Sequence, residues 1–467
     1  KDSYMVDNLV ILAYIVVVLY VGYTCRKLSG FKEFAIARGD YGWLAIFCTL
    51  AASFIGGGFS TGNAAKVFSS GMAYPVAMMG FSLQIILVAL FVAPRVKSFP
   101  GAVSVGDLIE PAYGRPARII TGLFAMLICG GILGAQIGAL GAIFKVFLDV
   151  PPLVGILTGS AIIFFYSTVG GMAAVVKTDI VQFCLLILAT PLLFVLGVHA
   201  CGGWPAFVAR IPASHLEVIG SHMTPRAFVS LFLVFLLGET LVPPYVQRLL
   251  IGRTVAATVK GNLWSGVVSV PFFLITGALG LVALQLDPNM AANLAMPEVV
   301  KRVAPVGVSG LIIAGVISIV MSSADSFLNA ASVALVQDVI KPLRTVALSD
   351  RQNLLIARVA NLFTGAIAMV FALTIPNVLD ILIAAYDYWA PTVLIPLVAV
   401  LLGWRVSPSS FYAAALAGVS GMLVWSRGLG NPGGVHGLVV GTGLSLAAFA
   451  VANGLQRRGA SGGQSGR

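Results

Sequence analysis

The segment IGGGFSTGNAAKVF, residues 55–68, interrupts one of the longest apolar stretches of the chain, residues 41–70. Its three consecutive glycines, residues 56–58, each cost about 1 kcal/mol in the interior of a helix. We therefore predict that the helix over 41–70 breaks next to Ile55. Close packing against a neighbouring helix is the alternative explanation, because small residues are common at helix contacts in membranes.

A second break is predicted at Glu239-Thr240-Leu241-Val242-Pro243-Pro244, inside the apolar segment 227–249. The two prolines remove backbone donors and clash with the preceding turn, although a simple kink would also accommodate them. Interrupted helices at matching places in two halves of a membrane protein are typical of transporters built from inverted repeats. The matched positions therefore favour a binding site at the two breaks.

The composition is that of a membrane protein. Hydrophobic residues make up 59 % of the chain and charged residues 10 %, against about 25 % charged in soluble domains. A membrane span needs about 20 apolar residues. We predict thirteen spans: 7–24, 41–70, 73–94, 118–147, 153–170, 179–200, 227–249, 262–284, 308–336, 354–374, 379–402, 409–426 and 435–455.

The predicted fold is an all-α integral membrane protein with an inverted-repeat (5+5) transporter core and two broken helices. The expected order is a first transmembrane helix with a cytoplasmic loop (1–40), a first five-helix repeat (41–200), an extracellular loop (201–226), a second, inverted five-helix repeat (227–402), two C-terminal helices (403–458) and a disordered tail (459–467).

The net charge of +11 reflects membrane orientation rather than binding to nucleic acid. With the N-terminus outside, cytoplasmic segments carry about 20 of the 28 Lys and Arg residues, as the positive-inside rule requires. This group includes Arg26, Lys27, Arg95, Lys97, Arg115, Arg248, Arg253, Lys341, Arg344, Arg405, Arg457 and Arg458. We expect a multi-pass protein of a bacterial inner (plasma) membrane, with its C-terminus cytoplasmic, in contact with lipid, and monomeric or weakly oligomeric.

The sequence does not resemble an enzyme. The five cysteines are scattered without a CxxC pair, and the four histidines do not cluster with them. The glycine run lacks the Lys-Ser/Thr ending of a phosphate-binding loop, and no nucleophile–base pair stands out. We therefore expect no catalytic site.

The polar run Met321-Ser322-Ser323-Ala324-Asp325-Ser326 lies inside the apolar segment 308–336. A charged residue at the centre of a membrane helix costs about 2.5–3.5 kcal/mol, so it indicates a functional site. Three hydroxyls and a carboxylate offer only oxygen, the ligand atom that a hard cation such as Na⁺ prefers. The alternative is that the serines hydrogen bond to carbonyls one turn earlier.

Four motifs together resemble the sodium:solute symporter family, which includes proline, pantothenate, sialic acid, glucose and choline transporters. They are IGGGFSTGNAAKVF (55–68), STVGGMAAVVKTDIVQF (167–183), PPYVQRLLIGR (243–253) and MSSADSFLNAAS (321–332). The resemblance covers about residues 7–455, and the glycine run and MSSADS are most similar to the choline branch. It implies the inverted-repeat core and Na⁺ as the coupling ion.

The resemblance also implies ion ligands. One Na⁺ would be held between the second and ninth spans by the carbonyls of Ala52, Ile55 and Ile319 and the hydroxyls of Ser322 and Ser323. A second ion or a proton would involve Asp179, Asp325 and Ser326. A second Na⁺, a proton and no second ion all remain open, and Asp179 is alternatively the N-cap of the sixth span.

By position, the resemblance places the solute against Phe54, Gly57, Gln84, Gln136, Glu239, Val242 and Tyr245. Glu239 beside a helix break indicates an amine-bearing solute or a titratable proton site. The tryptophans with which the choline branch cages a quaternary ammonium are replaced by Phe54, Ile132 and Val242, which disfavours choline itself.

The resulting hypothesis is Na⁺-coupled symport of a small organic solute by alternating access, with an amine-bearing, zwitterionic or amino-acid-like solute favoured. The alternatives are a proton-coupled symporter of the same fold and a transporter-like membrane sensor.

Overall fold

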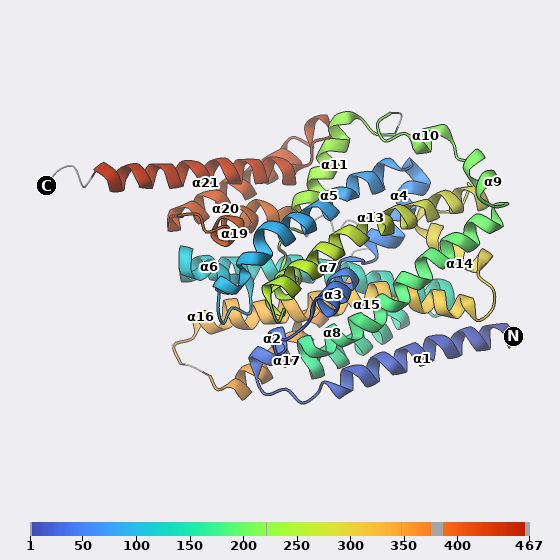
Figure 1. The fold of residues 1–467 in the computed structure, drawn as a ribbon, viewed down its shortest axis with the longest axis horizontal. Coiled ribbons are helices and arrows are strands. Elements are labelled where there is room, and N and C mark those ends of the chain that lie inside the picture. The colour runs from blue at the N-terminus through green and yellow to red at the C-terminus, as the bar shows by residue number, and fades with distance from the viewer. Residues whose placement is uncertain (1, 221, 347, 375–385, 463–467) are drawn as a thin grey trace.

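The protein is a bundle of α-helices that run mostly along its long axis (Figure 1). The computed structural model describes residues 2–220, 222–346, 348–374 and 386–462, without the side chains of 2–4 and 456–462. No β-strand occurs within these ranges. The elements are α1 Asp2–Thr24, α2 Phe31–Ile36, α3 Trp43–Phe54, η1 Gly58–Gly62, α4 Asn63–Ser70, α5 Ala73–Leu87, η2 Val88–Val92, η3 Ala93–Ser98, α6 Val105–Tyr113, α7 Arg115–Leu148, α8 Pro152–Ala200, α9 Trp204–Ala209, α10 Ala213–Leu216, α11 Pro225–Leu237, α12 Pro243–Leu250, α13 Val255–Leu286, η4 Ala292–Leu294, α14 Ala295–Val303, α15 Val308–Ala334, η5 Leu335–Ile340, α16 Lys341–Leu343, α17 Asp350–Thr374, η6 Ala390–Leu394, α19 Ile395–Leu401, α20 Pro408–Leu423, η7 Val424–Gly428, η8 Pro432–Gly434 and α21 Gly437–Gly462.

The described part of the chain contains nine helices long and apolar enough to cross a membrane, or ten when the bent pair α3 and α4 counts as one span. Two shorter apolar helices, Pro225–Leu237 and Tyr386–Leu401, add to these. The all-α membrane fold is confirmed, whereas the count of thirteen spans is not established. The start of the predicted span 379–402, Lys1 and the tail residues 463–467 lie outside the described residues, and the domain boundaries stay predictions.

Both predicted helix breaks are present. Helix α3 ends at Phe54, and the helix Gly58–Ser70, formed by η1 and α4, leaves it at an angle of 63°. Helix α11 ends at Leu237, and α12 begins at Pro243, where the fixed φ of proline suits the first helical position. The connection between them includes Leu241 at a positive φ of 56°.

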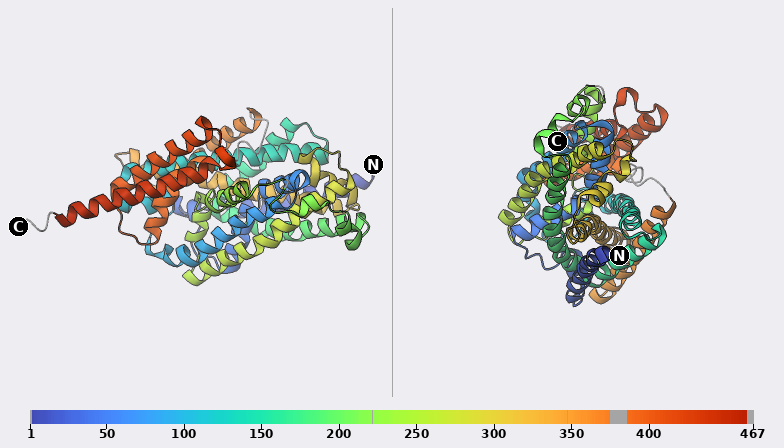
Figure 2. Two further views of the ribbon diagram at one scale, coloured as in Figure 1. Left: turned by 90° about the horizontal axis from the view of Figure 1, so that it is seen from above. Right: turned by 90° about the vertical axis from the view of Figure 1, so that its right-hand side faces the viewer.

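Helix α15 forms the centre of the bundle (Figures 1 and 2). Every residue from Ile312 to Ala334 is buried, as α7, α8, α1 and α17 surround the helix and α3 and α12 contact it. A second group of helices packs around α13, which contacts α3, α4 and α5, while α11 packs on α5. Helices α20 and α21 pair with each other at the periphery. The two broken helices therefore lie between the α13 group and the α15 group.

The predicted spans 153–170 and 179–200 are joined more tightly than expected. They form the continuous element α8, in which two helices meet at Gly171, whose φ is 53° and ψ −147°. The second helix therefore starts directly after Gly171, and Asp179 lies inside it. The interpretation of Asp179 as an N-cap is wrong, because a glycine with positive φ makes the turn without a loop.

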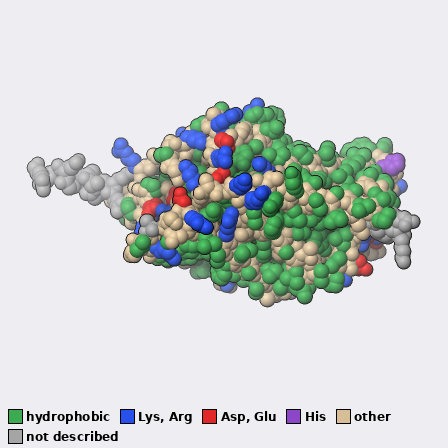
Figure 3. Space-filling view, turned by 90° about the horizontal axis from the view of Figure 1, so that it is seen from below, with side chains coloured by type: hydrophobic (Ala, Val, Ile, Leu, Met, Phe, Trp, Pro, Cys, Tyr) green, Lys and Arg blue, Asp and Glu red, His purple; other side chains and the backbone are tan. Residues whose placement is uncertain are grey.

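Basic side chains gather toward the end of the molecule from which α21 emerges (Figure 3). The N-terminus and the connection between α8 and α11 lie at the other end. The orientation in the membrane, which rests on this charge distribution, stays a prediction.

Replacing Gly171 by alanine should destabilise the protein, since an added Cβ would lie 2.7–2.9 Å from atoms of Phe34 and the backbone would be strained. Such conformations cost about 1–3 kcal/mol for a residue with a side chain. The matched control is Gly130→Ala in α7, where a Cβ would meet nothing within 4 Å. We expect the apparent melting temperature in detergent to fall for G171A and to stay level or rise for G130A. Equal melting temperatures would contradict this account.

Candidate functional site

The end of α3 approaches α15 and α7 so closely that only glycine fits there. Ile55 leaves the helical conformation with ψ of 71°, and the N–H of Gly56 donates to the carbonyl of Phe54 at 2.7 Å. A Cβ on Gly56 would lie 2.8 Å from Oγ of Ser323 and 2.9 Å from Nε2 of Gln136. The glycines of the first break thus allow a close approach in addition to interrupting the helix.

Serine hydroxyls of α15 contact the last carbonyls of α3. The hydroxyl of Ser322 donates to the carbonyl of Ala52 at 2.9 Å, and that of Ser323 donates to the carbonyl of Ser53 at 2.8 Å. Both hydroxyls also lie near the carbonyl of Ile319, at 3.2 and 3.4 Å. All these residues are buried. A cluster of carbonyl and hydroxyl oxygens therefore joins the two helices, and this donor set fits a hard cation such as Na⁺.

Four of the five predicted sodium ligands thus lie together, namely those of Ala52, Ile319, Ser322 and Ser323. The carbonyl of Ile55, the fifth, makes no hydrogen bond to α15 in the described structure. Sequence reasoning missed the carbonyl of Ser53, although its place after Ala52 in the last turn of α3 was a usable signal. Hydroxyl bonds to carbonyls one turn earlier also occur, as Ser322 donates to Ser318 at 2.8 Å.

The second predicted cluster contains an arginine, Arg248, that was predicted to lie in a cytoplasmic segment. Nη2 of Arg248 lies 3.2 Å from Oδ2 of Asp179 and 2.5 Å from Oγ of Ser326. The arginine and the aspartate side chains are both completely buried. The assignment of Arg248 to the exposed cytoplasmic anchors is therefore wrong: α12 carries it inward, and a buried carboxylate compensates its charge.

Asp325 lies on the other side of the same cluster. Its carboxylate accepts from the hydroxyl of Tyr166 at 2.7 Å and from Ser326 at 3.3 Å. The hydroxyls of Ser326 and Ser53 are 2.8 Å apart, so the cluster continues to the end of α3. Two carboxylates and one guanidinium are therefore buried next to the oxygens that join α3 to α15.

The second helix break holds a carboxylate without a cationic partner. Glu239 is buried and accepts hydrogen bonds from the hydroxyls of Tyr245 and Tyr386. No Lys, Arg or His within the described residues forms an ion pair with it. The indole of Trp389 donates to the carbonyl of Thr240 at 3.0 Å, which fixes the break from the side of helix Tyr386–Leu401.

A small cavity of about 10 Å³ lies between the two breaks and α15. It brings together four of the predicted solute contacts, and its lining includes Phe54, Gln136, Glu239, Tyr245, Ser323 and Tyr386. Sequence reasoning missed Tyr386, although Asp387 next to it in the apolar segment 379–402 was a usable signal.

The other three predicted solute contacts lie around this cavity without lining it. The backbone N–H of Gly57 donates to Oε1 of Gln136 at 3.0 Å, so Gly57 positions a lining residue. Gln84 bonds to the hydroxyl of Thr240, and Val242 is buried at the start of α12.

The fold and these clusters define a multi-pass membrane transporter with two broken helices. Residues 34–418 match the sodium:solute symporter family. The chain belongs to this family, whose members are transporters rather than enzymes and use Na⁺ as the coupling ion.

Relatives of known function agree with this assignment. The high affinity choline transporter 1 of Homo sapiens is 28 % identical over 460 residues, which cover 92 % of this chain and 78 % of the relative. The high-affinity choline transporter 1 of Drosophila melanogaster is 26 % identical over 374 residues. The match covers 74 % of this chain but only 58 % of the relative. The sodium/glucose cotransporter of Vibrio parahaemolyticus is 22 % identical, over 82 % of this chain and 77 % of the relative.

Solved structures confirm the fold. A Na⁺-coupled sialic acid symporter, in a substrate-bound outward-open state, superposes with a TM-score of 0.85 at 18 % identity, over 96 % of this chain and 97 % of that one. A nucleobase-cation-symport-1 family transporter superposes with a TM-score of 0.60 at 14 % identity, over 89 % and 93 %.

Losing one partner of the buried pair Arg248–Asp179 should destabilise the protein more than losing both. Removing one partner of a buried ion pair costs about 3–5 kcal/mol because the other charge stays buried. We expect Arg248→Gln to lower the apparent melting temperature strongly, and the double variant R248Q/D179N to recover part of the loss. Arg253→Gln, at an exposed position close by, is the control. A double variant less stable than R248Q would contradict the pairing.

Proposed function

We propose that the protein is a secondary active transporter that couples the uptake of a small organic solute to Na⁺ by alternating access. The observation that carries the proposal is the oxygen cluster that joins the end of broken α3 to the central helix α15. A cation bound there would be coordinated by oxygens of both α3 and α15 and would therefore bridge two groups of helices. Its occupancy can therefore favour one arrangement of the groups over another.

We assign the Na⁺ ligands to the carbonyls of Ala52, Ile55 and Ile319 and the hydroxyls of Ser322 and Ser323, as the resemblance to the family implies, with the carbonyl of Ser53 beside them. The two hydroxyls donate to carbonyls of α3 across the gap. A bound cation would instead accept lone pairs from both hydroxyls and from the carbonyls. One charge that moves across 100 mV supplies about 2.3 kcal/mol, enough for roughly 50-fold accumulation.

Contacts on the basic side of the molecule support an outward-facing state. There, Arg248 of α12 bonds to Asp179 and Ser326, and Nε2 of Gln247 donates to the carbonyl of Ala35 at 3.2 Å. The larger cavity, described below, lies at the opposite end. We propose a protein of a bacterial plasma membrane with the N-terminus outside and the C-terminus cytoplasmic, which makes this cavity extracellular.

For the second ion, the position of Arg248 favours one answer among those left open. Its guanidinium already supplies positive charge to Asp179 and Ser326. We propose that Arg248 replaces a second Na⁺ in this conformation. The proton-coupled and sensor alternatives predict ligand effects that do not depend on Na⁺, and the measurements below distinguish them.

For the solute, Glu239 favours an amine. A buried carboxylate whose partners are two neutral hydroxyls keeps its negative charge uncompensated, and a cationic group removes that cost. The cavity beside it touches both the oxygen cluster, through Ser323, and Gln136. An amine-bearing or zwitterionic solute would thus bind next to Na⁺, which gives a direct physical link between the two.

Removing the two hydroxyls should weaken Na⁺ binding specifically. Each hydroxyl supplies one oxygen ligand of the cation, so S322A/S323A should raise the half-maximal Na⁺ concentration at least about tenfold, or about 1.4 kcal/mol. The measurement is the melting temperature as a function of Na⁺, with K⁺ keeping the ionic strength constant. Ser332→Ala, buried farther along α15, should leave the Na⁺ dependence unchanged. An unaltered Na⁺ curve for the double variant would exclude these hydroxyls.

Glu239→Gln should weaken amine recognition while the amide oxygen accepts from one tyrosine hydroxyl and the amide N–H donates to the other. We expect 3-methylbutylamine to raise the melting temperature of the wild type in Na⁺ buffer, as a ligand of the native state does. The half-maximal concentration should rise at least about tenfold in E239Q because a charge-assisted bond is lost. Glu298→Gln in α14 is the matched control. Equal amine curves for E239Q and wild type would remove Glu239 from the solute site.

A further inference from the structure

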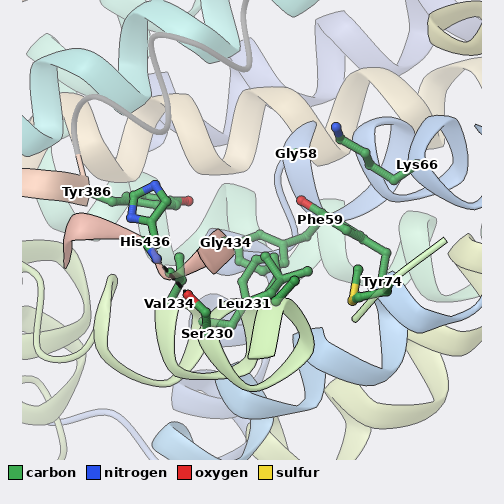
Figure 4. Close-up of a pocket in the computed structure, with 13 residues that line it drawn as sticks. Gly58, Phe59, Lys66, Tyr74, Ser230, Leu231, Val234, Tyr386, Gly434 and His436 are labelled. Carbon is green, nitrogen blue, oxygen red and sulfur yellow. Dashed lines mark hydrogen bonds between the residues drawn. The ribbon is translucent and has the colours of Figure 1, made fainter. Parts of the chain in front are cut away.

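A second, larger cavity opens at the end of the molecule where the N-terminus lies. Its volume is about 310 Å³, within the range of small-molecule sites. Aromatic and aliphatic side chains make most of its wall, among them Phe59, Tyr74, Leu231 and Phe235. Figure 4 shows Lys66 of α4 on one side and Tyr386 and His436 on the other. The lining side chains come from helices of both broken regions and from the C-terminal part of the chain.

The polar groups of this cavity favour an anion. Lys66 is half-buried and has no ion pair or hydrogen bond to any side chain or carbonyl within the described residues. The lining residues include Lys66 and His436 but no aspartate or glutamate. Asp387 approaches His436 at 3.5 Å from outside the lining. A lysine beside apolar walls loses hydration and gains from a carboxylate, which it binds as a point charge.

The two cavities share a wall. Gly58, Phe59 and Tyr386 line both the outer cavity and the small cavity at Glu239. Tyr386, whose hydroxyl donates to Glu239, also lines the outer cavity. A molecule in the outer cavity therefore lies against the side chains that close the inner one.

From this juxtaposition we infer that the outer cavity is a binding site for an apolar carboxylate, with the carboxylate on Lys66 and the apolar body among Phe59, Tyr74 and Phe235. A zwitterionic solute of the amino-acid class would occupy both cavities in turn, the inner one only after it widens from its volume of about 10 Å³. Its carboxylate binds Lys66 first, and its ammonium then reaches Glu239 once Phe59 and Tyr386 move. The ammonium step rests on the proposed function, whereas the carboxylate site does not.

The test uses three matched probes: leucine, 4-methylpentanoate, which lacks the amino group, and 3-methylbutylamine, which lacks the carboxylate. Thermal shifts are measured in lipid nanodiscs in Na⁺ buffer for the wild type, Lys66→Gln, Glu239→Gln and the control Lys301→Gln. Lys301 is an exposed lysine of α14, outside the cavity lining. 3-Phenylpropionate serves as a second, larger acid.

We expect the acids to stabilise the wild type, E239Q and K301Q alike, and to bind at least about tenfold more weakly to K66Q. The amine should bind at least about tenfold more weakly to E239Q and should stabilise K66Q as it stabilises the wild type. Leucine should lose affinity in both K66Q and E239Q. If the acids shift K66Q as they shift the wild type, or shift no variant, the carboxylate site is overturned. If the acids behave as expected while the amine ignores E239Q and Na⁺, the proposed function fails and the outer site remains.

Discussion

The structure depends on the close contact between the broken end of α3 and the buried helix α15. The contact requires that α3 stop being a helix where it meets α15, because a continuous helix would use its last carbonyls internally. Ile55 turns the chain away, and Gly56 leaves out the side chain that would otherwise collide with Ser323. The freed carbonyls then face the serine hydroxyls. The sodium site proposed here is a consequence of that geometry.

The buried charges make the same region sensitive to rearrangement. Arg248 belongs to α12, Asp179 to α8 and Asp325 to α15, so three elements meet through ionic groups that water does not reach. A buried charge that loses its partner is costly. The ion pairs between these elements are therefore expected to break and re-form together rather than one at a time. This gives a physical reason for two discrete arrangements rather than a continuous range, as alternating access requires.

Much of the fold could be predicted from the sequence because membrane helices and their interruptions leave local signals. The glycine run and Pro243-Pro244 located both breaks, since each acts on the backbone of its own segment. The hydroxyls of Ser322 and Ser323 were predictable because polar groups inside an apolar membrane helix are costly and therefore indicate a functional site. The sequence did not reveal the partner of Asp179, however. Whether Arg248 is exposed or buried depends on how α12 packs. Its charge alone favoured the incorrect prediction that it lies in a cytoplasmic segment. Tyr386 was missed for a similar reason, because its bond to Glu239 joins residues 147 apart in the chain.

The most direct test of the central claim is equilibrium binding of radioactive sodium to the purified protein without any solute. The account predicts saturable binding that unlabelled Na⁺ displaces and K⁺ at the same concentration does not. This result would show that the protein selects Na⁺ over K⁺ without a solute, as a site of carbonyl and hydroxyl oxygens between α3 and α15 requires. Binding no greater than the K⁺-competed background would contradict the account, because the oxygen cluster would then be a structural contact between helices and not the site of the coupling ion.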